Sequence, residues 1–295
     1  MFSRLGLRCY AITIERRGLI KELRGRTALV TGASGGIGAY IARRLAREGM
    51  TVAVSGRRED ALASVVAELR GIGVGAEAVP ADLADVNQVP SLIDRVEAVV
   101  GPLDVVINNA GLEYTAAFTN YATGELTSMV AVNLTAPLLL THRVVPGMLA
   151  RGRGHVVFIS SLAGKLGPAY SQPYAATKAG LVGLTQSLRS EYLHAPVGFS
   201  VICPGFVAGD GMYQRMVEQG IRSNRLLGAT TPEKVADKVV DAIRRNRPEV
   251  IESGAPIRPM IALAQLAPRL VERLTPLFGA NEVFRRAAAA RGRAD

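Results

Sequence analysis

Tyr174 and Lys178 are the side chains in this sequence whose types and spacing best suit acid–base chemistry. They follow an apolar, β-branched run, 156–159, that predicts a buried strand, and they fall in a segment that predicts a helix. Positions i and i+4 share a helix face, so we expect both side chains to point toward the carboxyl end of that strand. An ammonium group stabilises a nearby phenolate, so we also expect Lys178 to lower the pKa of Tyr174 toward working pH.

A glycine-rich turn near the start of the chain predicts a phosphate cradle. The sequence TGASGGIG, 31–38, lies between a short apolar strand, 27–30, and an amphipathic helix, 37–48. Gly32 permits the tight turn, Gly36 lets the backbone approach a pyrophosphate, and Gly38 lets the helix pack close to the sheet. The helix N-terminus then offers free N–H groups and a positive dipole end to the anion. Because strand and helix both flank the turn, an ordinary loop is the weaker interpretation.

The end of the second strand, 51–55, indicates which dinucleotide is bound. A carboxylate there would bind the ribose 2′-hydroxyl of NAD, but this chain has Ser55-Gly56-Arg57-Arg58. Two guanidinium groups suit a 2′-phosphate. We therefore predict NADP(H), with NAD(H) as the alternative. Arg57 is the stronger candidate of the two arginines, and the competing interpretation is that one or both are simply solvated.

Strands and helices alternate along the chain, which predicts an α/β protein: a Rossmann-type doubly wound parallel sheet of about seven strands flanked by helices. The expected strands are 27–30, 51–55, 76–80, 103–107, 156–159, 197–202 and 249–251, and the expected helices include 37–48, 59–70, 86–100, 123–150, a segment from Tyr174 to about 194, and 231–245. Residues 206–230 have no clear period and are a candidate substrate lid.

Three segments divide the chain: a basic N-terminal extension, 1–24; a dinucleotide-binding and catalytic domain, 25–253; and a basic, proline-punctuated helical extension, 254–295. In the last segment, 257–278 is apolar at helical spacing. It could close over the substrate pocket, pair with another subunit or rest on a membrane. Packing against its own protein is the favoured interpretation.

The formal net charge of +10 lies at the two ends of the chain. Basic residues exceed acidic ones by five in 1–26 and by five in 244–295, whereas the two kinds balance in 27–243. A nucleic-acid enzyme would place basic residues around its site, so we predict no nucleic-acid partner. The basic ends are either solvated tails or a surface for peripheral contact with an anionic membrane.

Composition narrows the setting further. Two cysteines give no disulfide framework, which indicates a reducing compartment, and three scattered histidines give no metal site. No apolar run reaches the length of a membrane span, and the first residues lack the apolar core of a secretory signal. We therefore expect a cytoplasmic protein, with membrane association as the alternative.

In order along the chain, these motifs resemble the short-chain dehydrogenase/reductase family over Gly25–Ser253. The resemblance rests on TGASGGIG at 31–38, Asn-Asn-Ala-Gly at 108–111, Asn133, Ser161, the Tyr174-x-x-x-Lys178 pair and Pro204-Gly205. It implies a homodimer or homotetramer. It also implies cofactor contacts at Gly32, Ser34, Gly36, Ile37, Gly38, Arg57, Arg58, Asp82, Leu83, Asn109, Ala110, Gly111, Tyr174, Lys178, Pro204, Gly205 and Val207.

The same resemblance implies the catalytic roles. Tyr174 would be the general acid in reduction and the base in oxidation, and Lys178 would lower its pKa and hold the nicotinamide ribose. Ser161, which matches the family serine in its spacing to Tyr174, would hydrogen-bond the substrate oxygen in preference to Ser160. Asn133 would support a water that links Lys178 to solvent.

The implied function is an NADP(H)-dependent oxidoreductase that interconverts a carbonyl and a secondary alcohol. The apolar character of 112–118 and 206–227 favours a small, lipophilic substrate. The chain departs from the family pattern at Gly209, where a threonine often helps to bind the cofactor, and in the tail beyond Ser253. The alternative function is an NADP(H)-binding sensor or scaffold without turnover.

Overall fold

The computed structural model describes residues 20–209, 212–218, 220–221, 228–278 and 280–291. Most of the predicted N-terminal extension, 1–19, therefore lies outside the described residues. So do 210–211, 219 and 222–227 of the predicted lid, and 279 and 292–295 of the C-terminal extension. The division of the chain into three segments stays a prediction.

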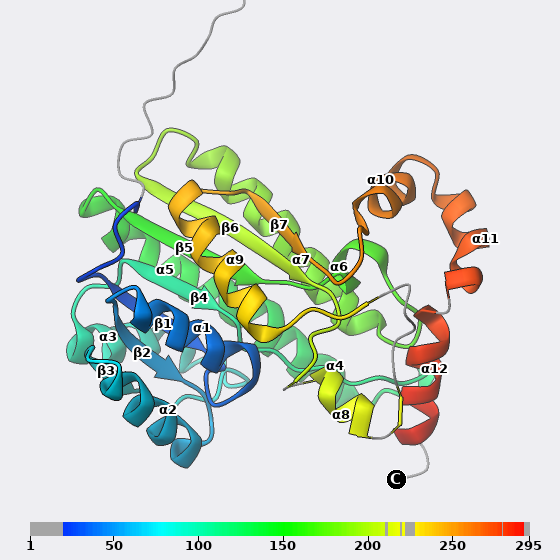
Figure 1. Ribbon diagram of the computed structural model, residues 1–295, viewed down its shortest axis with the longest axis horizontal. Helices are drawn as coiled ribbons and strands as arrows, with labels where there is room; N and C mark the ends of the chain where they lie inside the picture. The colour runs from blue at the N-terminus through cyan, green and yellow to red at the C-terminus, as the bar shows by residue number, and fades with distance from the viewer. Residues whose placement is uncertain (1–19, 210–211, 219, 222–227, 279, 292–295) are drawn as a thin grey trace, which may run out of the picture.

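A parallel sheet forms the centre of the molecule, as the alternation of strands and helices predicts (Figure 1). Within the described residues it has seven strands in the order β3-β2-β1-β4-β5-β6-β7. The strands are β1 (Thr27–Thr31), β2 (Thr51–Ser55), β3 (Ala76–Ala78), β4 (Val105–Asn108), β5 (Gly154–Ile159), β6 (Val197–Pro204) and β7 (Glu249–Glu252). Every residue of β5 and β6 is buried, because helices cover both faces of the sheet.

Helices pack on the two faces in separate layers (Figure 1). One layer consists of α1 (Gly36–Arg47), α2 (Glu59–Gly71) and α9 (Pro232–Arg245). The opposite layer contains α3 (Val89–Val100), α5 (Ala136–Ala150) and α7 (Gln172–Glu191). Each layer has its own apolar core, represented by Leu45 and Val239 on one face and by Leu140 and Leu181 on the other. The predicted doubly wound fold is thus confirmed.

The direction of winding reverses between β1 and β4, where a parallel α/β sheet leaves a crevice at the carboxyl ends of its strands. The turns after these two strands touch here. A Cβ atom added to Gly32, whose φ is +65°, would lie 2.7 Å from the Ala110 Cα. A Cβ atom on Gly38 would lie 2.4 Å from the Gly32 carbonyl oxygen. Side chains at either position would push apart the turn and the helix that border the crevice.

The long helix predicted at 123–150 is present, with an internal irregularity. It comprises α4 (Thr123–Val130), a π-helical turn (Ala131–Thr135) and α5. By length and composition Thr123–Ala150 could cross a membrane, but half of its most apolar window is buried inside the protein. It is therefore a core helix here. The π-helical turn carries Asn133, and such turns are frequent at functional sites.

Some element boundaries differ from the expected ones. The third strand ends at Ala78 instead of residue 80, and α3 begins at Val89 instead of residue 86. The carboxylates of Asp82 and Asp85 accept hydrogen bonds from the backbone N–H groups of Ala84 and Asn87, at 3.0 and 3.2 Å. These local bonds satisfy the backbone in turns and so compete with helix formation.

The C-terminal extension packs on its own protein, as the sequence favours. It forms α10 (Arg258–Leu266), α11 (Pro268–Phe278) and α12 (Ala280–Arg291), which stand at one side of the sheet (Figure 1). From α12, Val283 and Ala287 pack with Ile221, and Phe206 packs against this cluster. Part of the predicted lid is also helical, as α8 (Met212–Glu218), where no periodicity was expected.

Candidate active site

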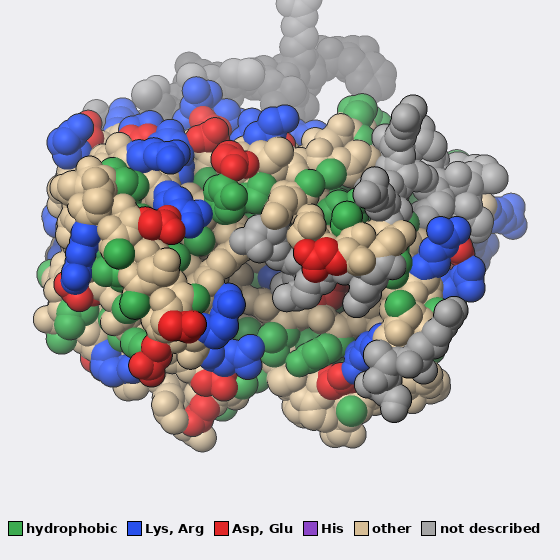
Figure 2. Space-filling model, turned by 60° about the horizontal axis from the view of Figure 1, so that its bottom comes forward, with side chains coloured by type: hydrophobic (Ala, Val, Ile, Leu, Met, Phe, Trp, Pro, Cys, Tyr) green, Lys and Arg blue, Asp and Glu red, His purple; other side chains and the backbone are tan. Residues whose placement is uncertain are grey.

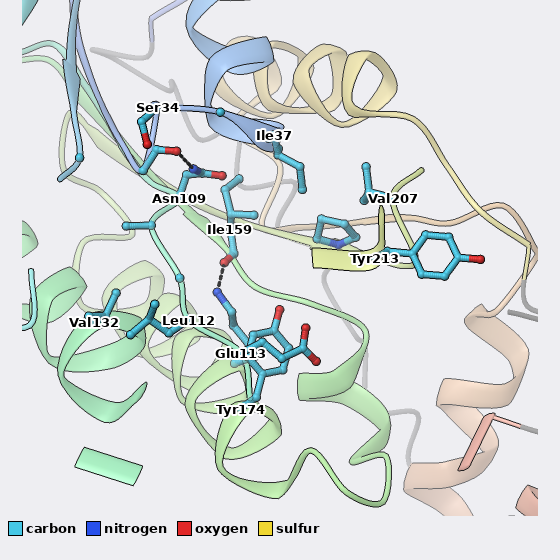
Figure 3. Close-up of a pocket in the computed structure, with 18 of the residues that line it drawn as sticks. Ser34, Ile37, Asn109, Leu112, Glu113, Val132, Ile159, Tyr174, Val207 and Tyr213 are labelled. Atoms are coloured by element: carbon cyan, nitrogen blue, oxygen red, sulfur yellow. Dashed lines mark hydrogen bonds between the residues drawn. The ribbon is translucent and has the colours of Figure 1, made fainter. Parts of the chain in front are cut away.

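A pocket of about 380 Å³ lies in the crevice at the carboxyl ends of the strands. Ser34 and Asn109 lie at one end of the close-up in Figure 3, and Tyr174 and Glu113 lie at the other. The space-filling view in Figure 2 shows a hollow near the middle of the surface, bordered on one side by Lys or Arg side chains. Residues from both halves of the sheet therefore line this one pocket.

Tyr174 and Lys178 both point from α7 into this pocket, as their spacing predicts. Both are nearly enclosed, with exposed fractions of 8% and 3%. The Lys178 Nζ atom donates a hydrogen bond of 2.8 Å to the Ile159 carbonyl oxygen (Figure 3). It lies 5.5 Å from the centre of the Tyr174 ring. The last residue of β5 thus positions the amine beside the phenol.

The two adjacent serines after β5 have different partners. The Ser160 hydroxyl donates a hydrogen bond of 2.7 Å to the Lys178 carbonyl oxygen, and this bond fastens β5 to α7. The Ser161 hydroxyl instead hydrogen-bonds the Tyr174 phenol. It also accepts a bond of 3.1 Å from the Ala163 backbone N–H, at the start of the short helix α6 (Ala163–Leu166). Ser160 lines the pocket but its hydroxyl is engaged by α7, and that Ser161 is the serine that acts with Tyr174 stays a prediction.

The expected lowering of the Tyr174 pKa is wrong for the protein without its cofactor. Burial raises the pKa of this phenol strongly, the nearby Glu113 carboxylate raises it further, and only the Ser161 hydrogen bond opposes them. Burial also lowers the pKa of Lys178 to about 8, while Glu113 acts in the opposite direction. Desolvation of an enclosed phenolate outweighs the expected help from the amine. At neutral pH the phenol is protonated, which is the form that can donate a proton.

Glu113 is a pocket residue that the sequence analysis did not single out. Figure 3 shows its carboxylate beside Tyr174. The Ser171 hydroxyl donates a hydrogen bond of 3.3 Å to its Oε1 atom. The sequence feature that could have indicated it is a single acidic residue directly after Leu112, at the start of the apolar 112–118 segment. Its charge acts on both ionisable groups of the Tyr174–Lys178 pair.

Asn133 lies behind the pocket wall, fully buried. Its Oδ1 atom accepts a hydrogen bond of 2.7 Å from the Leu112 N–H, and its Nδ2 atom donates one of 2.8 Å to the Leu112 carbonyl oxygen. A further bond of 3.2 Å reaches the Thr177 hydroxyl on α7. These bonds satisfy the side-chain amide of this buried asparagine. Through these bonds Asn133 holds the backbone at Leu112, next to Glu113, against α7. The role of Asn133 in a water relay stays a prediction.

The other end of the pocket suits the phosphates of a dinucleotide. Ser34, Gly36 and Ile37 line it at the N-terminus of α1, whose first turn carries no acidic residue. Arg57 and Arg58 border the same end, and Arg58 donates a hydrogen bond of 2.7 Å to the Ser34 carbonyl oxygen. Every predicted cofactor contact except Gly38 lines the pocket. Gly38 serves the packing of helix against turn instead.

The turn after β4 is held in place by the side chain of Asn109. Its Nδ2 atom donates hydrogen bonds to the carbonyl oxygens of Thr31 and Gly32, at 2.8 and 3.2 Å. Asp82, Leu83, Ala110 and Gly111 continue the lining from there, and Pro204, Gly205 and Val207 line it at the end of β6 and just beyond. These residues fit a dinucleotide laid across the sheet edge, with backbone and small side chains where the cofactor must approach closely.

Aromatic and sulfur-containing side chains from outside the sheet cover part of the pocket. They are Phe206, Tyr213, Met216 and Phe284. The rings of Phe206 and Tyr213 lie 4.9 Å apart, and those of Phe206 and Phe284 lie 6.1 Å apart. Phe284 belongs to α12, so the C-terminal extension contributes directly to the site. Its place could not be predicted, because only the folded chain brings α12 to Phe206.

Comparison with known proteins agrees with this architecture. The short chain dehydrogenase family model matches residues 26–220. The ketoacyl reductase HetN of Nostoc sp. (strain PCC 7120) is 40% identical over 262 residues, which cover 87% of this chain and 90% of that protein.

Two solved structures resemble the fold closely. A 3-oxoacyl (acyl-carrier-protein) reductase from Agrobacterium tumefaciens with NADP bound has a TM-score of 0.73 at 31% identity, covering 80% of this chain and 96% of that one. A short-chain dehydrogenase/reductase from Burkholderia phymatum in complex with NAD has a TM-score of 0.74 at 25% identity, covering 84% and 96%. With about two thirds of its length matched by the family model, and with a 40% identical relative covered to 90%, the chain belongs to the short-chain dehydrogenase/reductase family of NAD(P)-dependent oxidoreductases that act on carbonyl and alcohol groups.

Proposed function

We propose that this protein is an NADP(H)-dependent oxidoreductase that interconverts a ketone and a secondary alcohol on a lipophilic substrate, with a 3-oxoacyl chain as the leading class. One observation carries the proposal: a single pocket has an acid–base pair, Tyr174 and Lys178, at one end and two guanidinium groups beside Ser34 at the other. Relatives named as ketoacyl reductases support the substrate class.

In this proposal the Tyr174 phenol and the Ser161 hydroxyl hold the substrate oxygen by hydrogen bonds. The cofactor supplies or accepts the hydride. Negative charge develops on the substrate oxygen during reduction, and two donors aimed at that atom stabilise it. Tyr174 then gives up its proton to the oxygen, which is consistent with a phenol that burial keeps protonated. Lys178, fixed on the Ile159 carbonyl oxygen, supplies positive charge as the phenolate forms.

Preference for NADP(H) rests on Arg57 and Arg58. Both side chains are exposed at the pocket edge and available to a phosphate, and no carboxylate follows β2 directly. A guanidinium group binds a phosphate through charge-assisted, bidentate hydrogen bonds. The NADP-bound relative supports the same choice, and the NAD-bound relative keeps NAD(H) as the alternative.

A lipophilic substrate suits the walls around Tyr174. Leu112, Val132, Phe206 and Phe284 contribute apolar surface to the pocket. Burying an apolar group there is favourable by about 25 cal/mol per Å² of surface removed from water. Glu113 is the acidic side chain on this wall closest to the acid–base pair, so an anionic group on the substrate would lie away from it.

Peripheral membrane contact through the C-terminal extension would bring such substrates to the enzyme. Leu263, Leu266 and Leu270 are exposed on α10 and α11, and basic residues such as Arg269 lie on the same helices. Flotation with anionic liposomes checks this. Wild type should float, and a Leu266→Asp, Leu270→Asp double variant should not; equal flotation would exclude a role for these helices.

A homodimer or homotetramer is expected in solution.

Tyr174→Phe is the decisive test of the mechanism. The variant keeps the ring and loses the proton donor, so turnover of 3-oxoacyl esters with NADPH should fall roughly 10²–10⁴-fold. NADPH binding, measured by fluorescence titration, should change little. Tyr170→Phe is the matched control. Ala116 and Tyr121 donate hydrogen bonds to the backbone carbonyl oxygen of Tyr170, and the substitution keeps that carbonyl group.

Near wild-type turnover by Tyr174→Phe would contradict the assigned acid. A wild-type protein that binds NADPH yet reduces none of a broad carbonyl panel would instead favour the sensor or scaffold function.

A further inference from the structure

A second cavity, of about 610 Å³, lies between the chain that follows β5 and the C-terminal helices. Its walls include Leu166 and Pro168 on one side, and Ile257, Met260 and Val271 on the other. Its volume lies within the range of roughly 300–1,000 Å³ typical of small-molecule sites. The extension beyond Ser253 therefore does more than pack against the sheet: it encloses a space.

This cavity adjoins the catalytic pocket. Gly205, Phe206 and Phe284 line both. The partition between the two spaces is thus formed largely by two aromatic side chains, whose ring centres are 6.1 Å apart. Rotation of the Phe206 or Phe284 side chain would open this partition without moving the backbone of the sheet.

The charges around the second cavity do not favour an anionic ligand inside it. Lys165 is paired with Glu249 at 2.8 Å, which neutralises this cation in the wall. Glu272 on α11 adds a negative charge at the lining. The remaining walls are mostly aliphatic or aromatic. An uncharged hydrocarbon is the occupant that fits this chemistry, since burying apolar surface is favourable and demands no polar partner.

The C-terminal helices hold the cavity in a defined place. The Asn281 side chain on α12 accepts a hydrogen bond of 3.2 Å from the Ala169 backbone N–H. At the far end of the same helix, Arg291 forms an ion pair with Glu125 on α4. These two contacts tie α12 to elements that border the catalytic pocket, so the two spaces keep their relative position.

We propose that the second cavity holds the aliphatic chain of the substrate whose carbonyl group lies at Tyr174, so that the C-terminal helices select substrates by chain length. This inference rests on the proposed function and adds where the chain lies. The substrate would pass from Tyr174 beside Phe206 and Phe284 toward Met260. A single continuous site would then be built from the sheet and the extension together.

The test measures kcat/KM for esters of increasing length, from 3-oxobutanoate to 3-oxododecanoate, with NADPH. Because each buried methylene strengthens binding roughly fourfold, kcat/KM of the wild type should rise by up to that factor per methylene until the cavity is full. Met260→Trp fills the cavity and should lower kcat/KM for the long esters roughly tenfold or more while leaving the shortest unchanged. Ala264→Phe, on the same lining, is a second variant that should act alike.

Ala262→Trp is the matched control, because Ala262 is exposed on the same helix and does not line the cavity. Its chain-length profile should follow that of the wild type. A flat profile for the wild type, or an equal loss for short and long esters in both cavity-filling variants, would overturn the inference while turnover of 3-oxobutanoate upholds the proposed function. Failure of the wild type to reduce even 3-oxobutanoate would contradict the proposed function and this inference with it.

Discussion

The Lys178 ammonium group donates a hydrogen bond of 2.8 Å to the carbonyl oxygen of Ile159, the last residue of β5. A buried lysine is thereby held at one point of the sheet edge, with its charge only partly compensated. Burial lowers its pKa to about 8, against an ordinary value of 10.5. At pH 7 the amine is therefore still mostly protonated, and binding of an anionic cofactor or formation of a phenolate would stabilise that charge further.

Lys178→Met should change the pH dependence of the unfolding free energy and should also lower turnover. Between pH 8 and 10.5 the unfolded wild type binds more protons than the folded form, so its unfolding free energy should rise with pH. Relative to Lys178→Met, the wild type should gain up to about 3 kcal/mol across this window. Urea denaturation of both proteins without cofactor measures the difference. Turnover by the variant should fall roughly 10²-fold or more. Parallel stability curves would show that the lysine titrates normally.

Glu113→Gln should move the pH dependence of the reaction. The Glu113 carboxylate raises the pKa values of both Tyr174 and Lys178, so removing its charge should lower both. Alcohol oxidation needs the phenolate, so its rising alkaline limb should shift to lower pH. The Ser171 hydroxyl, which donates a hydrogen bond to Glu113, is uncharged, so the substitution removes the charge at this point of the pocket wall. Plots of log kcat/KM against pH for oxidation check the shift.

Asp60→Asn is the control for this charge change, because Asp60 is an exposed acid on α2. It should leave the profile in place. A Glu113→Gln profile that coincides with the wild type, or moves to higher pH, would show that this carboxylate does not act on the phenol.

Local spacing made part of the site predictable from the sequence. The Tyr174–Lys178 pair and the glycine-rich turn depend on helix period and on the strand and helix that flank them, which a single segment reveals. The long-range parts were not predictable. Phe284 reaches the pocket only after α12 folds back, and the pKa of Tyr174 depends on enclosure by separate elements. An apolar pattern indicates that a segment is buried, but it does not name the neighbours.

Arg58 should matter for NADP(H) at least as much as Arg57, contrary to the ranking from sequence. Its guanidinium group is already placed by the bond to the Ser34 carbonyl oxygen, which reduces the ordering needed to grip a phosphate. Each arginine-to-alanine change should weaken NADPH binding roughly 10- to 100-fold, since one hydrogen bond to a charged group is worth about 1.5–3 kcal/mol. NADH affinity should hardly change. Isothermal titration with both cofactors measures this; tighter binding of NADH than NADPH by the wild type would overturn the cofactor preference.

Asn133→Ala should damage stability and catalysis together, because one side chain satisfies both backbone groups of Leu112. Leaving these two part-buried backbone groups unpaired costs at most about 1–3 kcal/mol each, which urea denaturation should detect. The chain at Leu112 would also loosen beside Glu113, so kcat should fall. Thr177→Val is the control: it removes the hydroxyl that accepts the weaker bond from Asn133 and donates one of 2.8 Å to the Tyr174 carbonyl oxygen, and it leaves both Leu112 bonds intact. A similar loss in the two variants would show that the contact with α7, and not the hold on Leu112, is what Asn133 provides.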